Sequence, residues 1–350
     1  MSIPEKPDRE RPLKLALSSI EDLLGAVPYL LGFQPTDSIV VVAIAGTHVV
    51  TGVRGDLPAP DAPAGLVQAV AAALAHRALT GGVDTVAILG YGPAHAFDPV
   101  AAVVRAVFSE HHTEILEVVR VFDGRYFSYL DPGPDDGVPF DAATSTTARL
   151  AAHLGGTVFT DRDELVASIA PVTGADREAM SRALAAAVER LRLVKDTAGA
   201  PGLFAAGRQA LHNALARYRA GGRLDDDEMA WLIVHLFHPG ICTLAWLHTD
   251  TSAWQEHLWR DATRRADPEV VAPAASLLAF VAWRRGHGTL ADAAVQRALQ
   301  AEPDYRLALL IDRVLTVGLP PSALDGWPPA QVLDALDPDL SDPTSEPTTD

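Results

Sequence analysis

The sequence contains almost no cysteine and no long apolar run. Cys242 is the only cysteine among 350 residues, so the chain cannot form an internal disulfide or build a multi-cysteine zinc or iron–sulfur site by itself. No stretch offers the roughly eighteen uninterrupted apolar residues typical of a membrane-spanning helix, and the charged, proline-rich first residues lack the apolar core of a signal peptide. We therefore expect a cytoplasmic protein that does not enter the membrane.

Basic residues are also scarce. The chain has 28 Lys and Arg against 45 Asp and Glu, which gives a formal net charge of −17. Nucleic-acid affinity draws on Lys and Arg that neutralise phosphates, so this balance argues against a nucleic-acid partner. The pairs Arg264-Arg265 and Arg284-Arg285 are interpreted as solvated helix positions.

The sequence does contain enough apolar residues to form hydrophobic cores. Apolar residues make up 48% of the chain, and its length is typical of about two domains. Residues 1–12 and 328–350 are charged or rich in Pro, Ser and Thr, and we expect both ends to be disordered. The remainder is predicted to form a first domain over 13–156 and a helical region over 157–327.

The first domain alternates between helix and strand patterns. Ser18 and Glu21 have capping-box spacing before an apolar-periodic helix, and the β-branched run 38–44 followed by 48–53 predicts a hairpin. The later elements, a helix or a strand in each case, are predicted over 66–79, 83–89, 99–108, 115–122, 126–130 and 144–153. The order of helices and strands predicts an α/β (α+β) domain with a mixed sheet covered by helices, not a fully parallel one.

Residues 157–327 carry almost only helix patterns. The run 176–195 places apolar residues on one stripe with Arg and Glu opposite. Further helices are predicted over 203–218, 228–237, 252–264, 271–285, 289–301 and 305–317. Gly286, Ala291, Ala298 and Pro303 have the spacing of the latter part of a tetratricopeptide repeat (TPR). Because only one such unit is present, we favour a local TPR-like helical hairpin over a repeat array.

A candidate ligand-binding rim is predicted where strands end in the first domain. Its residues are Asp37, Arg54, Asp56, Gly90, Gly92 and Arg125. A turn from strand to helix is a common ligand position in α/β proteins, and an Arg side chain binds carboxylate or phosphate through its planar fork. The alternative is a salt-bridged loop cluster beside an ordinary turn.

The nearest approach to a metal site lies in the helical region. Its members are His235, His238, Cys242 and His248. Zinc would require all four ligands to converge, yet Pro239-Gly240 interrupts the run and aromatic residues surround it. We therefore favour a packed helical region here, and we interpret the acidic run 225–228 as a helix start, where negative charge is favourable.

One stretch resembles a known family. The segment 23–42, LLGAVPYLLGFQPTDSIVVV, is similar to the opening of the domain of unknown function 4192 family, which is found in actinobacteria, and the stretches 54–58, 123–128 and 279–307 agree with it. Family members often carry cysteines shortly after the Asp-Gly-Arg turn, whereas the corresponding loop 131–137 has none. The resemblance implies no activity, substrate or cofactor.

The sequence contains no catalytic motif that defines a reaction. We therefore expect a non-enzymatic binding or regulatory protein whose helical half presents a surface to a protein partner. The alternative is an enzyme, either a hydrolase or a nucleotide-using protein, with its site on the predicted rim. Neither a cofactor nor an oligomeric state follows from the sequence.

Overall fold

The computed structural model describes residues 19–324, except 46–47, 60, 80–82 and 154–157. The chain divides into two compact units. The first contains the chain up to Leu165 together with Gly286–Thr289 and Arg313–Pro320, and the second contains Val166–Arg285 and Leu290–Asp312. The predicted disordered ends and the predicted boundary at 156 lie outside the described residues.

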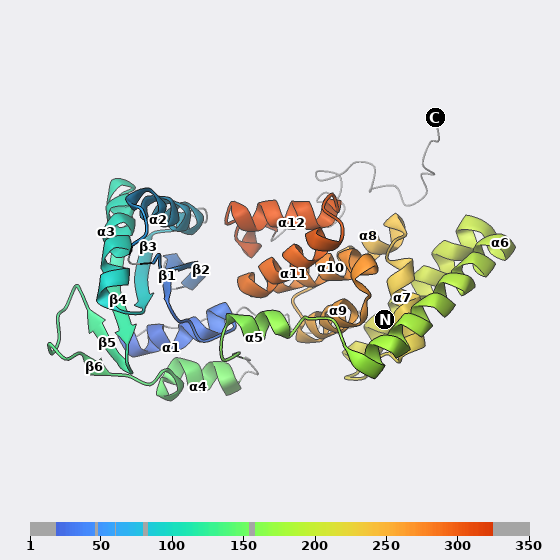
Figure 1. Ribbon diagram of the computed structural model, residues 1–350, viewed down its shortest axis with the longest axis horizontal. Coiled ribbons are helices and arrows are strands. Elements are labelled where there is room, and N and C mark those ends of the chain that lie inside the picture. Colours follow the sequence, from blue (N-terminus) through green and yellow to red (C-terminus); the bar gives the residue numbers. More distant parts are fainter. Residues whose placement is uncertain (1–18, 46–47, 60, 80–82, 154–157, 325–350) are drawn as a thin grey trace, which may run out of the picture. The chain divides into compact units, whose positions relative to one another are not determined.

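A six-stranded mixed sheet organises the first unit (Figure 1), which confirms the predicted fold class. The strands are β1 Ser38–Ala45, β2 His48–Asp56, β3 Thr85–Tyr91, β4 Glu114–Phe122, β5 Arg125–Ser128 and β6 Val138–Pro139. Their order in the sheet is β2-β1-β3-β4-β5-β6. Only β3 and β4 run parallel, and the other neighbours are antiparallel.

Helices cover both faces of this sheet. Helices α2 (Ala64–Leu79) and α3 (Ala94–Glu110) pack on one face, over a buried apolar cluster that includes Ile39, Ile88 and Phe97. Helix α1 (Ile20–Leu31) lies against the opposite face, where its Glu21 meets Tyr126 of β5. Helix α4 (Thr146–His153) packs beside α1.

Helix α1 begins one residue later than the spacing predicted. Its N-cap is Ser19, whose hydroxyl accepts a hydrogen bond from the Asp22 amide at 3.2 Å, whereas Ser18 lies outside the described residues. Pro28 does not end the helix, which continues to Leu31 and closes on Gly32 in the left-handed region (φ 83°). Glycine is favoured there because it has no Cβ to clash.

The described residues of the second unit form helices and turns and no strand. After α5 (Arg162–Ala167), the helices are α6 Gly174–Arg219, α7 Asp226–His235, α8 Pro239–Leu247, α9 Ala253–Arg265, α10 Ala272–Arg284, α11 Gly288–Ala301 and α12 Arg306–Thr316. The first two residues of α11 and the last four of α12 belong to the first unit. The helical run does break at Pro239, where α7 has ended and α8 begins, but the sequence did not predict α8 itself. Pro239 is the first helical residue of α8, a position where its missing N–H costs nothing.

The element α6 consists of two helical arms that meet at a kink. The sequence predicted two helices, 176–195 and 203–218, and the structure agrees, because Gly199 between them has non-helical dihedral angles (φ 63°, ψ −164°) and is followed by Pro201. Both arms pack on α7. On the first arm the Arg190 guanidinium lies 4.1 Å from the centre of the Trp231 ring.

No single described helix is long and apolar enough to span a membrane. Helices α7 and α8 together meet that requirement by length and composition, but they are bent by 107° at their junction. Most of their residues are buried within the unit.

A late segment of the chain completes the first unit. The Arg77 Nε atom at the end of α2 donates a hydrogen bond to the Thr316 carbonyl at 3.4 Å. Gly318 has a positive φ of 70°, and a Cβ there would lie 2.7 Å from the Arg77 carbonyl oxygen. The chain therefore needs glycine at this close approach.

Candidate functional site

The ends of three strands bring most of the predicted rim together. Ser38 pairs with Asp56 of β2 on one side and with Tyr91 of β3 on the other. Asp37, Asp56 and Gly92 therefore meet at one edge of the sheet, and Arg54 lies two residues before Asp56 on the same strand. This arrangement follows from the register of the strands.

Arg54 is the central charged group of this rim. Its Nε donates a hydrogen bond to the Ser38 hydroxyl at 2.9 Å, and its terminal nitrogen forms an ion pair with Asp56 at 2.5 Å. Its guanidinium also lies 5.9 Å from the centre of the Phe33 ring. The Arg54 side chain is 17% exposed and that of Asp56 is 80% exposed, so the pair lies at the edge of solvent.

Asp37 carries an exposed carboxylate in a strained backbone position. Its φ is 43°, which is uncommon for a residue with a Cβ. Its carbonyl accepts a hydrogen bond from the Leu57 amide at 2.9 Å. One carboxylate oxygen of Asp37 lies 3.7 Å from the position that a Cβ on Gly92 would occupy. The two turns therefore touch at the rim.

The two rim glycines serve packing and turn geometry. A Cβ on Gly90 would lie 2.2 Å from the Phe97 ring, so the missing side chain makes room for that ring. Gly92 adopts a φ of 154° and donates its N–H to the Val121 carbonyl at 3.0 Å. Neither glycine forms an anion-binding loop in this geometry, and His95 beyond them is exposed.

Tyr91, between these glycines, is a polar group that the sequence did not single out. The residue is buried, and its hydroxyl oxygen has no hydrogen-bond partner among the described residues. Burial raises the pKa of this phenol far above its ordinary value. The sequence feature that could have identified Tyr91 is its position between two glycines at the end of a predicted buried strand.

A second polar pair lies on the same face of the sheet. The Tyr126 hydroxyl donates a hydrogen bond to Glu21 of α1 at 2.8 Å. Burial, followed by this bond, raises the pKa of Tyr126 to about 12. Backbone hydrogen bonding, followed by the bond from Tyr126, lowers the pKa of Glu21. The pair fixes the first turn of α1 over β5.

Arg125 does not join the rim group. It follows the predicted tight turn, in which Asp123 and Gly124 both have positive φ. Its guanidinium donates to the Gly137 carbonyl at 2.9 Å and pairs with Asp136 at 3.1 Å. Arg125 therefore holds the loop before β6.

The four residues of the candidate metal cluster do not converge. Among the described residues no group of three or more His, Cys, Asp or Glu side chains has metal-binding geometry. His238 instead caps α8 by accepting the Gly240 amide at 3.2 Å, and the Cys242 thiol lies 3.5 Å from the Tyr305 hydroxyl. His235 is 1% exposed, and burial is the main cause that lowers its pKa to about 4.

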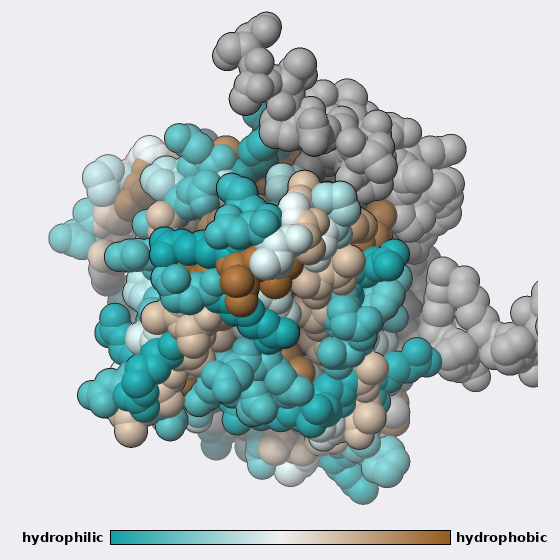
Figure 2. All heavy atoms as spheres, turned by 90° about the vertical axis from the view of Figure 1, so that its right-hand side faces the viewer, coloured by the Kyte–Doolittle hydropathy of each residue, from teal (hydrophilic) through white to brown (hydrophobic). Residues whose placement is uncertain are grey.

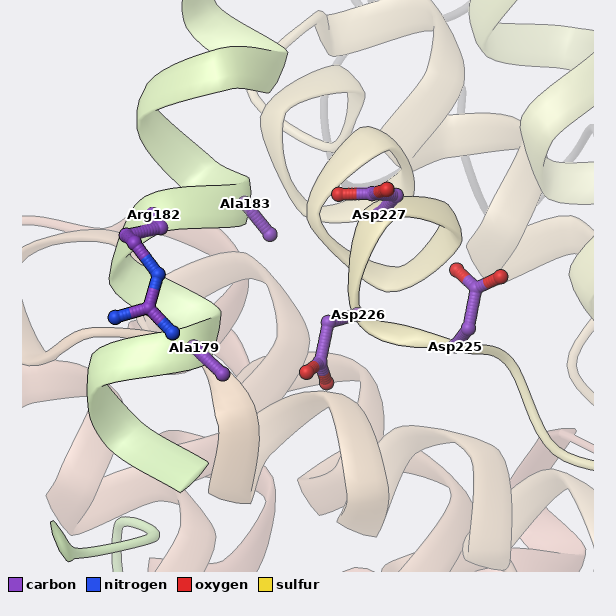
Figure 3. Close-up of a pocket in the computed structure, with 6 residues that line it drawn as sticks. All are labelled: Ala179, Arg182, Ala183, Asp225, Asp226 and Asp227. Carbon is purple, nitrogen blue, oxygen red and sulfur yellow. The ribbon is translucent and has the colours of Figure 1, made fainter. Parts of the chain in front are cut away.

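Two hollows lie away from the rim. One of about 740 Å³ is in the first unit and is lined by Ala72, His76, Leu79, Val83, Asp84, Val107, His111 and Thr113. The other, of about 430 Å³, lies between α6 and α7, with Ala179, Arg182 and Ala183 on the α6 side and Asp225, Asp226 and Asp227 at the start of α7 (Figure 3). Asp225 forms a capping box with Glu228 there, which confirms the prediction of a helix start.

The bend of α6 carries exposed apolar side chains. Leu193 is 63% exposed and Phe237, which follows α7, is 46% exposed. Half-buried Val194 and Phe204 lie on the two arms beside the bend, and Phe204 contacts the His238 ring at 5.7 Å between ring centres. Figure 2 looks at the α6 side, where hydrophobic side chains gather among hydrophilic ones. We call Leu193, Val194, Phe204 and Phe237 the bend surface.

The charge around the bend is opposite to that of the whole chain. Between residues 189 and 208 the basic residues are Arg190, Arg192, Lys195 and Arg208, and the acidic ones are Glu189 and Asp196. The segment thus has a formal charge of +2, from four basic and two acidic residues, in a chain of −17.

The structure defines a two-part protein in which a mixed α/β unit is joined to an all-helical unit. The sequence matches the family described as Domain of unknown function (DUF4192) over residues 21–322, and the chain belongs to this family. This confirms the resemblance carried by the segment 23–42. No curated protein and no solved structure matches the chain.

Proposed function

We propose that this protein works by binding another polypeptide through the bend surface of its helical unit, as a cytoplasmic binding or regulatory protein. The single observation that supports the proposal is the exposure of Leu193 and Phe237 beside the α6 bend. Large apolar side chains gathered on a surface mark protein-interaction sites when polar residues surround them. Aromatic anchors such as Phe237 contribute strongly to interfaces.

The charge at the bend indicates the chemistry of the partner. The segment 189–208, with a formal charge of +2 in a strongly acidic chain, favours a partner segment that presents apolar side chains flanked by Asp or Glu. Such a segment places its apolar groups on Leu193 and Phe237 and its carboxylates near Arg192 and Lys195. Opposite charges steer the encounter and exclude basic partners.

Photo-crosslinking in the native cells tests this proposal. A benzophenone amino acid is placed at position 193 or 237 and, as a control, at Leu66 of α2, which is 50% exposed. We expect one common acidic polypeptide in the adducts from positions 193 and 237 and none from position 66. Adducts only with a second copy or with the chain's own residues 325–350, or no adduct at either position, would overturn the proposal.

A second experiment measures the contribution of each apolar group. Leu193→Asp and Phe237→Asp should each weaken binding of the crosslinked partner by at least tenfold, since both remove apolar contact and introduce a repelled charge. Leu66→Asp is the matched control and should leave the affinity unchanged. Equal losses in all three variants would contradict a localised surface.

The rim supports a second candidate function, an enzyme site. The observation in its favour is that exposed Asp37, the Arg54–Asp56 pair and the buried Tyr91 hydroxyl gather at the ends of three strands. A thermal-shift screen with nucleotides and small anionic metabolites tests it. A stabilisation that is lost in Arg54→Ala and kept in Arg125→Ala would favour this candidate. If no compound raises the unfolding temperature, the result counts against it.

A further inference from the structure

Arg297 of α11 carries a buried charge without a partner. Both terminal nitrogens of its guanidinium are inaccessible to solvent and have no hydrogen-bond acceptor among the described residues. A guanidinium has five N–H donors and cannot shed its proton near neutral pH. Burying such a group without an acceptor is strongly unfavourable, so an uncompensated arginine at this place requires an explanation.

A second arginine lies close to it. Arg264, in the last turn of α9, is exposed. Burial, followed by repulsion from Arg264, lowers the pKa of Arg297 to about 10. The two arginines are both positively charged, so together they require more neutralising negative charge than Arg297 alone.

The buried acids on α9 are already engaged by other cations. Asp261 accepts from Arg223 at 2.8 Å and from Arg265 at 3.3 Å, and it also bonds Tyr218. Glu256 pairs with Arg260 at 2.9 Å and with Arg285 at 3.0 Å. Neither carboxylate is therefore available to neutralise the Arg264–Arg297 pair.

We propose that Arg264 and Arg297 form a binding site for a phosphoryl group. Two guanidinium groups match the charge of a phosphate dianion better than that of a single carboxylate, and each can donate two parallel N–H bonds to oxygens. Exposed Arg264 meets the anion first. The terminal nitrogens of Arg297 are buried before binding, so the proposal includes a turn of this side chain toward the anion, and the half-buried position of the residue leaves room for it at the surface.

This site is independent of the bend surface. It uses α9 and α11 and none of the residues proposed for the polypeptide partner, so either proposal can fail alone. The ligand class is a small phosphate-bearing compound or inorganic phosphate, and both sources present the same dianionic group.

Thermal unfolding of the full chain tests the site at constant ionic strength. The probes are sodium phosphate, glycerol phosphate and sodium chloride, each with the wild-type protein, Arg297→Met, Arg264→Gln and the control Arg219→Gln. Arg219 is an exposed arginine at the end of α6 in the same unit. At about 100 times the dissociation constant, a bound phosphate should raise the midpoint by roughly 5 °C or more.

The order of the variants decides the outcome. In chloride, Arg297→Met should melt above the wild type because its uncompensated charge is gone. In phosphate or glycerol phosphate, the wild type and Arg219→Gln should gain stability while Arg297→Met and Arg264→Gln gain none. Response to glycerol phosphate alone would identify an organic phosphate as the ligand and support the site.

No gain in the wild type, or an equal gain in every variant, would overturn the proposal. If Arg297→Met fails to fold, the exposed Arg264→Gln gives the same test.

Discussion

At the residue scale, His235 is a histidine that the helical core holds in its neutral form. Its ring lies edge-on to Trp231 at 4.3 Å between ring centres, and a Cβ on Gly207 would be 2.8 Å from its Nδ1. Its Nε2 has no hydrogen-bond partner among the described residues. Protonation would place an unpaired cation in this packing, which is why its pKa falls to about 4.

This environment predicts acid sensitivity. Between pH 6.5 and about 4 the unfolded chain binds a proton at this position that the folded protein does not, so stability falls as the pH drops through that range. The loss should reach about 3 kcal/mol. Urea unfolding of wild type and His235→Leu at pH 7 and pH 5 checks it, because the variant should lose this part of the pH dependence. His257→Gln, at an exposed position in the same unit, should keep the wild-type dependence.

Gly90 gives a second prediction at this scale. Gly90→Ala would force a methyl group against the Phe97 ring, 2.2 Å away, and displace the ring from the core of the first unit. We expect a loss of about 1–3 kcal/mol in the free energy of unfolding. Gly65→Ala is the matched control, since that helical position opens to free space and alanine there should be neutral or stabilising. Equal stability of the two variants would contradict the packing role.

The residues of the rim show what spacing can and cannot predict. Asp37, Arg54, Asp56 and Gly92 are brought together because strand-end positions follow from the hairpin register and the strand order. The role of Gly90 was not predictable, since it depends on where the Phe97 ring turns from α3. Tyr91 was missed for a similar reason: the burial of its hydroxyl is a property of the folded sheet.

At the scale of elements, the long patterns were predicted well and the short ones were missed. Helices α9 to α12 and strands β1 to β4 carry enough apolar periodicity to fix their type, whereas β6 has two residues and α5 has six, too few for a period to show. The two arms of α6 were predicted as separate helices, 176–195 and 203–218, and the kink at Gly199 and Pro201 separates them in the structure.

The capping box of α7 supports a prediction about an element. Asp225 accepts the Glu228 amide at 2.8 Å and Glu228 accepts the Asp225 amide at 3.1 Å. Asp225→Ala should therefore cost about 1 kcal/mol of stability, measured by urea unfolding. Asp227→Ala is the control, because Asp227 lies in the same first turn but is not the cap. A similar loss in both variants would indicate that general acidity near the helix dipole matters more than the cap.

At the scale of the whole molecule, the sequence predicted an α/β part followed by a helical part. It did not predict that the first unit takes residues 286–289 and 313–320 from the other end of the chain. Those residues have ordinary helix and turn patterns, and nothing in a pattern shows which unit a segment contacts. The contact of Gly318 with Arg77 depends on the folded path of the chain.

This feature predicts the effect of truncation. Ending the chain after residue 312 removes the Thr316 and Gly318 contacts with Arg77, and amide hydrogens in α2 should then exchange at least tenfold faster, as read by mass spectrometry. Ending it after residue 324 keeps those contacts and should leave α2 protected. Equal exchange in the two truncated chains would show that the late segment adds nothing to the first unit.

The same contact has a consequence during synthesis. Ribosomes build the sheet early, but the residues that lie against the end of α2 are among the last described residues to emerge. During synthesis, the end of α2 therefore stays incompletely covered until the helical region has been translated. Domains usually fold as units from the N-terminus onward, whereas here the first unit begins to fold early and is complete only when residues 313–320 have emerged.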